Sequence, residues 1–78
     1  MKLGTRLLYR CSSNASLLIL LVRHGSHSDS WKGYLFNEET GETLLATRAN
    51  LGVDSALNRC QLAVFRMGES AVVMPVAA

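Results

Sequence analysis

The sequence predicts a small α+β domain, in which an antiparallel sheet of four to five strands packs on one helix in the C-terminal half of the chain, in the order β-β-β-β-α-β. Two observations predict this class. Short apolar or alternating runs separated by turn residues extend to residue 48, and apolar residues recur at three- and four-residue spacing over residues 53–67. With 78 residues, the chain is expected to form a single compact domain, 1–78.

The first two strands are predicted from different hydrophobic patterns. Residues 5–11 alternate between apolar and basic or polar side chains, which is typical of a half-exposed strand. Residues 16–23 are apolar at nearly every position. This pattern predicts a central strand covered on both sides, although periodicity alone leaves a short buried helix open. The turn-forming Ser12-Ser13-Asn14 between the two segments indicates a hairpin.

Two further strands are predicted on either side of a polar turn. Residues 31–37 are rich in aromatics and residues 43–48 form a second short run. The intervening NEETGE contains Gly41, which can adopt positive φ, so the two strands are expected to form a hairpin. Residues 24–30 are expected to be a polar loop, and Asn50-Leu51-Gly52 interrupts the pattern before the helix.

The predicted helix follows this interruption. Asp54 is the expected cap at its start, and Gly68 stands where a helix-terminating C′ residue belongs. Residues 71–76 form the last predicted strand, which Pro75 confines to a sheet edge. The expected core stripe of the helix consists of Val53, Ala56, Leu57, Cys60, Ala63, Val64 and Met67.

The composition favours association with another protein. Hydrophobic residues make up 49% of the chain and charged residues only 18%. A domain of this size buries only about 60% of its unfolded surface, and surplus apolar surface usually becomes an interface. A homo-oligomer or a partner-binding protein is therefore expected. The apolar run at 15–22 is far shorter than the ~20 residues that a membrane-spanning helix needs, so we expect no membrane association and a cytoplasmic location.

One short motif carries potential chemistry. The stretch LVRHGS, residues 21–26, resembles the motif of the histidine phosphatase superfamily, the phosphoglycerate-mutase-like enzymes. The resemblance implies that His24 is the phosphorylated nucleophile and that Arg23 holds the phosphate. It covers about six residues, and no histidine follows Ser28 to supply the family's distant second histidine. A histidine-phosphatase-like fragment is therefore a remote alternative, and no catalytic residue is assigned.

The cysteines and histidines are the candidates for metal binding or disulfide formation. Cys11, Cys60, His24 and His27 would form a Cys2His2 zinc set, but structural zinc sites use closely spaced ligand pairs and the two cysteines lie far apart in sequence. A disulfide between Cys11 and Cys60 would close a long loop, whereas buried free thiols are the more common use of two cysteines in a cytoplasmic protein. No metal or cofactor is predicted.

The helix carries the strongest candidate for a binding surface. Leu62 and Phe65 fall far from the core stripe, beside Arg59 and Arg66, and are expected on the solvent side. Exposed apolar anchors flanked by arginine have the composition of a protein-binding hot spot. The alternative is that the helix is sandwiched, with Leu62 and Phe65 under the N-terminal segment or a loop. The sequence therefore predicts a non-enzymatic protein-binding module of inhibitor or modulator type, comparable in size to phage-encoded inhibitors and toxin–antitoxin partners, that also self-associates.

Nucleic-acid binding is the second functional hypothesis. Residues 1–28 contain no acidic residue, and Arg6 and Arg10 lie about 13 Å apart along one strand face at ~3.3 Å per residue. These arginines are candidates for phosphate contact, or for a second polar contact with a partner protein. A net charge of only +2 and few lysines make the nucleic-acid hypothesis the weaker of the two.

Overall fold

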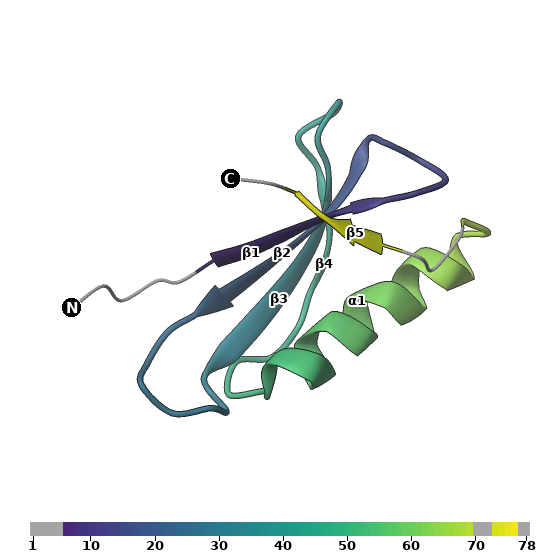
Figure 1. Cartoon of the computed structure of the whole chain (residues 1–78). Helices are drawn as coiled ribbons and strands as arrows, with labels where there is room; N and C mark the ends of the chain where they lie inside the picture. The colour runs from purple at the N-terminus through teal and green to yellow at the C-terminus, as the bar shows by residue number, and fades with distance from the viewer. Residues whose placement is uncertain (1–5, 70–72, 77–78) are drawn as a thin grey trace.

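The computed structural model describes residues 6–69 and 73–76, and it has the predicted α+β architecture (Figure 1). One helix lies against one face of a five-stranded antiparallel sheet whose strand order is β4-β3-β2-β1-β5. The elements are β1 (Arg6–Cys11), β2 (Leu17–Arg23), β3 (Trp31–Asn37), β4 (Thr43–Ala46), α1 (Val53–Arg66) and β5 (Val73–Pro75).

The sheet is a meander to which a fifth strand is added. Hairpins connect β1 to β4 in chain order, and after α1 the chain returns to pair β5 with the free edge of β1. The central position predicted for residues 16–23 is confirmed, because β2 is hydrogen-bonded on both sides. Pro75 lies in the edge strand, as its missing N–H requires. The predicted strand positions 71 and 72 fall outside the described residues.

The core lies between α1 and the sheet face beneath it. Leu17, Ile19 and Leu21 of β2 point toward the helix and are almost completely buried. The side chains that face them from α1 are small. They belong to Ala56, Cys60 and Val64, which share one side of the helix and have no exposed surface. These small residues allow the helix to approach the strands closely, which fixes where its other flanks lie.

Gly68 ends the helix as predicted, with a φ of 82°, and Gly41 has a φ of 75° in the β3–β4 turn. The predicted capping role of Asp54 is wrong. The cap residue is Gly52, no side chain caps the helix, and Asp54 lies in the first turn, where its charge favours the helix dipole. Met67 was also predicted wrongly as core. It follows the last helical residue, and 49% of its surface is exposed.

The prediction that β2 is covered on both sides is only half correct. The helix covers one face of the sheet, and no other described element lies over the opposite face (Figure 1). Leu20 and Val22 point to that face and are half-buried by their neighbours in the sheet. A fully apolar strand pattern predicts that both faces avoid water, but it does not say whether the same chain covers both.

Within the described part of the chain, α1 is the one helix, and with 14 residues it lacks the length and apolar character needed to cross a membrane.

Candidate functional site

Leu62 and Phe65 lie on the outer side of α1, and their predicted exposure is confirmed. The exposed fractions are 48% for Leu62 and 65% for Phe65. The cause is helical geometry, because the fully buried Ala56, Cys60 and Val64 define the opposite side of α1. No described segment covers these two side chains, so the alternative of a sandwiched helix is wrong for residues 6–69 and 73–76.

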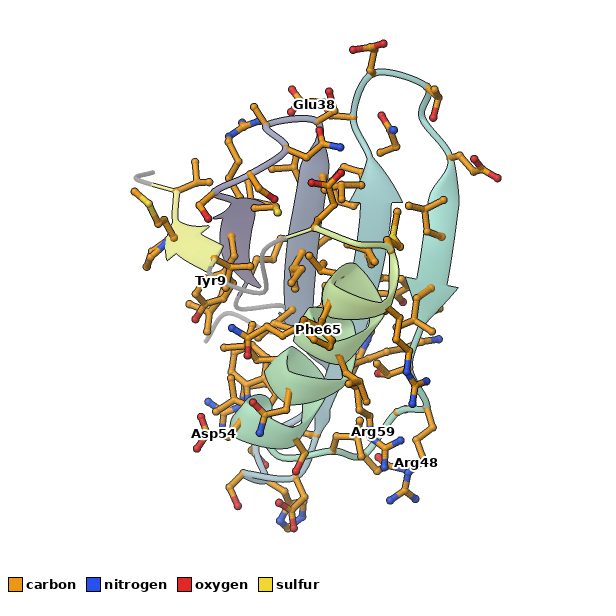
Figure 2. The ribbon with its side chains drawn as sticks, turned by 90° about the vertical axis from the view of Figure 1, so that its right-hand side faces the viewer. Tyr9, Glu38, Arg48, Asp54, Arg59 and Phe65 are labelled. Atoms are coloured by element: carbon orange, nitrogen blue, oxygen red, sulfur yellow. The ribbon has the colours of Figure 1, made fainter. Side chains whose placement is uncertain are left out.

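A groove runs between α1 and β4, and three of the predicted binding residues line it. Its volume is about 500 Å³. Figure 2 shows Arg59 of the helix and Arg48, which follows β4, on the same side of the molecule. A second hollow, of about 350 Å³, continues along the helix past Arg59 and Leu62. The lining of the main groove is Leu45, Ala46, Thr47, Arg48, Arg59, Leu62, Ala63 and Arg66.

The spacing of residues on the helix explains its wall of the groove. Leu62 and Ala63 lie three and four residues after Arg59, and Arg66 lies four and three residues after them, so all four share the flank of α1 nearest β4. Ala63 packs against the edge of the core, and Leu62 stands further out. The wall is therefore apolar at its base and basic at both ends.

The opposite wall depends on how β4 ends. The strand has only four residues, and Thr47 directly after it is buried. The Thr47 hydroxyl accepts a hydrogen bond from the Gly33 N–H at 2.9 Å and donates one to the Arg48 carbonyl at 2.9 Å. These two bonds hold the backbone that carries Arg48. Sequence reasoning missed Arg48, because its relation to the helix depends on this tertiary anchor.

The groove is positively charged. Three arginines line it, and no carboxylate, histidine or cysteine side chain is among its described lining residues. Within residues 6–69 and 73–76 the ion pair found is Arg10–Glu38, which lies outside the groove. Arg48, Arg59 and Arg66 therefore have no acidic partner among these residues. The groove therefore offers guanidinium donors around apolar surface, a combination suited to binding carboxylates that flank an apolar group.

The remaining predicted binding residues lie outside the groove. Phe65 projects from the outer side of α1 (Figure 2) and is absent from the groove lining. The register of β1 places Arg6 and Arg10 on the sheet face opposite α1. Arg10 donates to Glu38 at 3.1 Å and also to the Ala15 carbonyl, whereas Arg6 is exposed. The six predicted residues thus do not form one site.

The Arg-His-Gly motif closes a loop. Arg23 is the last residue of β2, and its side chain donates to the Ser26 carbonyl at 2.7 Å. The His24 N–H donates to the Ser30 carbonyl at 2.8 Å, while the His24 side chain is exposed. The guanidinium therefore fastens the loop in which the motif lies, a geometry that lends no support to a phosphate-binding role.

Cys11 and Cys60 are both buried and no disulfide joins them, so the disulfide alternative is wrong. Burial raises the pKa of the Cys60 thiol from 9.0 to about 11, which keeps it protonated and poorly nucleophilic. In the described part of the chain, no three or more histidine, cysteine, aspartate or glutamate side chains gather as metal ligands would.

Comparisons of the chain with protein-family models, with curated proteins and with solved structures find no match.

Proposed function

We propose that this chain is a small non-enzymatic protein-binding module that acts by docking on a partner protein through the groove between α1 and β4. The observation that carries the proposal is the grouping of Arg48, Arg59 and Arg66 around Leu62 and Ala63 with no acidic side chain in the lining. Three cations without counter-charges repel one another, so this grouping favours a ligand that supplies negative charge.

The chemistry of the groove favours a particular partner segment. Guanidinium groups bind carboxylates bidentately. The apolar base of the groove contributes to binding affinity only if an apolar side chain of the partner covers it. We therefore expect an acidic segment in which one large apolar residue lies between carboxylates. Such a module would act as an inhibitor or modulator by occupying a partner's surface.

The test is selection of ligands from a phage-displayed random-peptide library on the immobilised wild-type chain. Enriched peptides are expected to combine aspartate or glutamate with a leucine or an aromatic residue. Binding of a synthetic enriched peptide should weaken at least about 30-fold in Arg59→Glu or Leu62→Asp, the effect typical of a lost hot-spot residue. The matched control is Arg6→Glu, which makes the same charge change on the opposite face. Peptides that bind all variants equally would contradict the proposal.

Nucleic-acid binding through Arg6 and Arg10 remains the competing hypothesis, and the structure offers it less support. Arg10 is already paired with Glu38, which leaves Arg6 as the free cation of that strand. A fluorescent single-stranded oligonucleotide tests it directly. Binding that Arg6→Glu abolishes and that weakens steeply with salt would replace the present proposal.

A further inference from the structure

The sheet face opposite α1, called here the open face, is apolar where an exposed sheet face should be polar. Antiparallel sheets with one face in water normally alternate between apolar and polar side chains. Here the registers of β1, β2 and β3 bring apolar residues together on the open face: Leu8, Leu18, Leu20, Val22, Tyr34 and Phe36. Met74 of β5, opposite Arg10, adds a side chain that is 59% exposed.

We infer that a second copy of this chain covers the open face, forming a two-fold dimer in which the two sheets pack face to face with their strands antiparallel. The inference does not depend on the proposed function, because the groove lies on the other side of the sheet. Two observations select a second copy, namely the distribution of charge along the strands and the size of the face.

Charge is distributed unevenly along the strand direction. Arg6 and Lys32 flank Val22 at one end of the open face, where β1 begins and β2 ends. The other end carries the β3–β4 turn, with Glu38, Glu39 and Glu42 (Glu38 is labelled in Figure 2). A two-fold axis perpendicular to the strands places the acidic end of one copy over the basic end of the other. The chain is therefore complementary to itself in this orientation.

The acidic end of the open face is already partly closed within each copy. Arg10 belongs to β1 and Glu38 follows β3, so their 3.1 Å ion pair spans β2 between them. Leu18 lies in this row, between Arg10 and Phe36, and is only 4% exposed. The next row, Leu8–Leu20–Tyr34, has no such bridge. Leu20 is therefore the centre of the proposed interface.

The size of the face suits a reversible dimer. The five strands have six, seven, seven, four and three residues, and at about 3.3 Å per residue and about 4.8 Å between strands they give an area of about 430 Å² per copy, or about 860 Å² for two copies. This total is slightly smaller than the ~1,000–1,200 Å² at which stable specific interfaces begin, and it is typical of weak, reversible complexes. We therefore expect a monomer–dimer equilibrium that depends on protein concentration and, because its centre is apolar, persists at high salt.

Sedimentation equilibrium of the wild-type chain over a wide concentration range tests the inference. Leu20→Lys should raise the dimer dissociation constant at least about 30-fold, as expected for a central anchor lost from both copies. Leu62→Lys, the matched control on α1, should leave the dimer dissociation constant unchanged. Circular dichroism should show that this variant is folded. A wild-type chain that stays monomeric, or a dimer that Leu62→Lys breaks and Leu20→Lys does not, would overturn the inference.

If Leu20→Lys unfolds the chain, an exchange of charges between the two ends of the open face provides a second test. Lys32→Glu places a carboxylate opposite the acidic turn of the second copy, and Glu39→Lys places an ammonium opposite its basic end. Each substitution alone should weaken the dimer, and the two together should restore it, because opposite charges then face each other again. Effects of the two substitutions that simply add would refute the antiparallel arrangement.

Discussion

Replacing Gly33 by alanine tests whether the close approach of α1 to the sheet defines the core. Gly33 lies in β3 directly beneath the helix. A Cβ added there would lie 3.0 Å from Cys60 Sγ, 3.2 Å from the Ala56 carbonyl oxygen and 3.2 Å from Leu21 Cδ2. All three distances are tighter than most real Cβ contacts, so the neighbouring atoms must move by a few tenths of an ångström to admit one methyl group.

Two opposing effects set the size of the change. Gly33 has no positive φ, so alanine suits the strand backbone and would stabilise it by about 0.5–1 kcal/mol through the unfolded state. Overpacking a core costs about 1–3 kcal/mol. The steric cost should prevail, because Cys60 is fully buried and the Ala56 oxygen belongs to the helix backbone. We expect Gly33→Ala to lower the free energy of unfolding by about 1–2 kcal/mol.

Urea unfolding followed by circular dichroism measures this difference, with protein concentration held constant because dimerisation would also contribute to stability. The midpoint should fall while the slope m stays the same. Gly25→Ala is the matched control, since its added Cβ would meet Ser30 at an ordinary 3.5 Å. Combining Gly33→Ala with Cys60→Ala should recover about 1 kcal/mol relative to the sum of the single effects. A Gly33→Ala chain at least as stable as wild type would refute the reasoning.

Two further predictions concern the same region of the molecule. Thr47→Val removes the hydroxyl that accepts the Gly33 N–H, and should lower the free energy of unfolding by about 1–3 kcal/mol in urea titrations, whereas Thr47→Ser should largely preserve it. Because burial raises the Cys60 pKa from 9.0 to about 11, the folded state disfavours the thiolate. The contribution of the protonated Cys60 thiol to the free energy of unfolding should be complete below pH 9. It should decrease by about 1.4 kcal/mol per pH unit between pH 9 and 11. Urea titrations across this range should show that additional decrease in wild type and not in Cys60→Ala.

The order of elements was predictable because its signals are local. Strand alternation, helical spacing and the positive φ of Gly41 and Gly68 each depend on a few neighbouring residues. Details at the helix ends were less accessible. Asp54 is a good cap by residue type, yet the helix begins two residues earlier than capping by Asp54 requires, with Gly52 as its cap.

The groove was only partly predictable for a different reason. Helical spacing identified Leu62 and its flanking arginines, because those residues share one element. Arg48 joins them only through the packing of α1 on the sheet and the buried hydrogen bonds of Thr47. The position of Arg10 is likewise a tertiary result, since Glu38 reaches it only when β3, β2 and β1 lie side by side.

The two proposed surfaces have a joint consequence, because they lie on opposite sides of one thin sheet. A dimer formed through the open faces would bury Leu20 at its centre and direct both helices outward, so that each copy keeps its groove accessible. A partner that carries two acidic segments, or that is itself dimeric, would then bind both grooves at once. Binding of the second groove would then be intramolecular. This would strengthen overall binding by about 10²–10⁴-fold with no change in the contacts within either groove. Leu20→Lys should abolish that gain while leaving the affinity for a single peptide unchanged, which separates the role of the dimer from that of the groove.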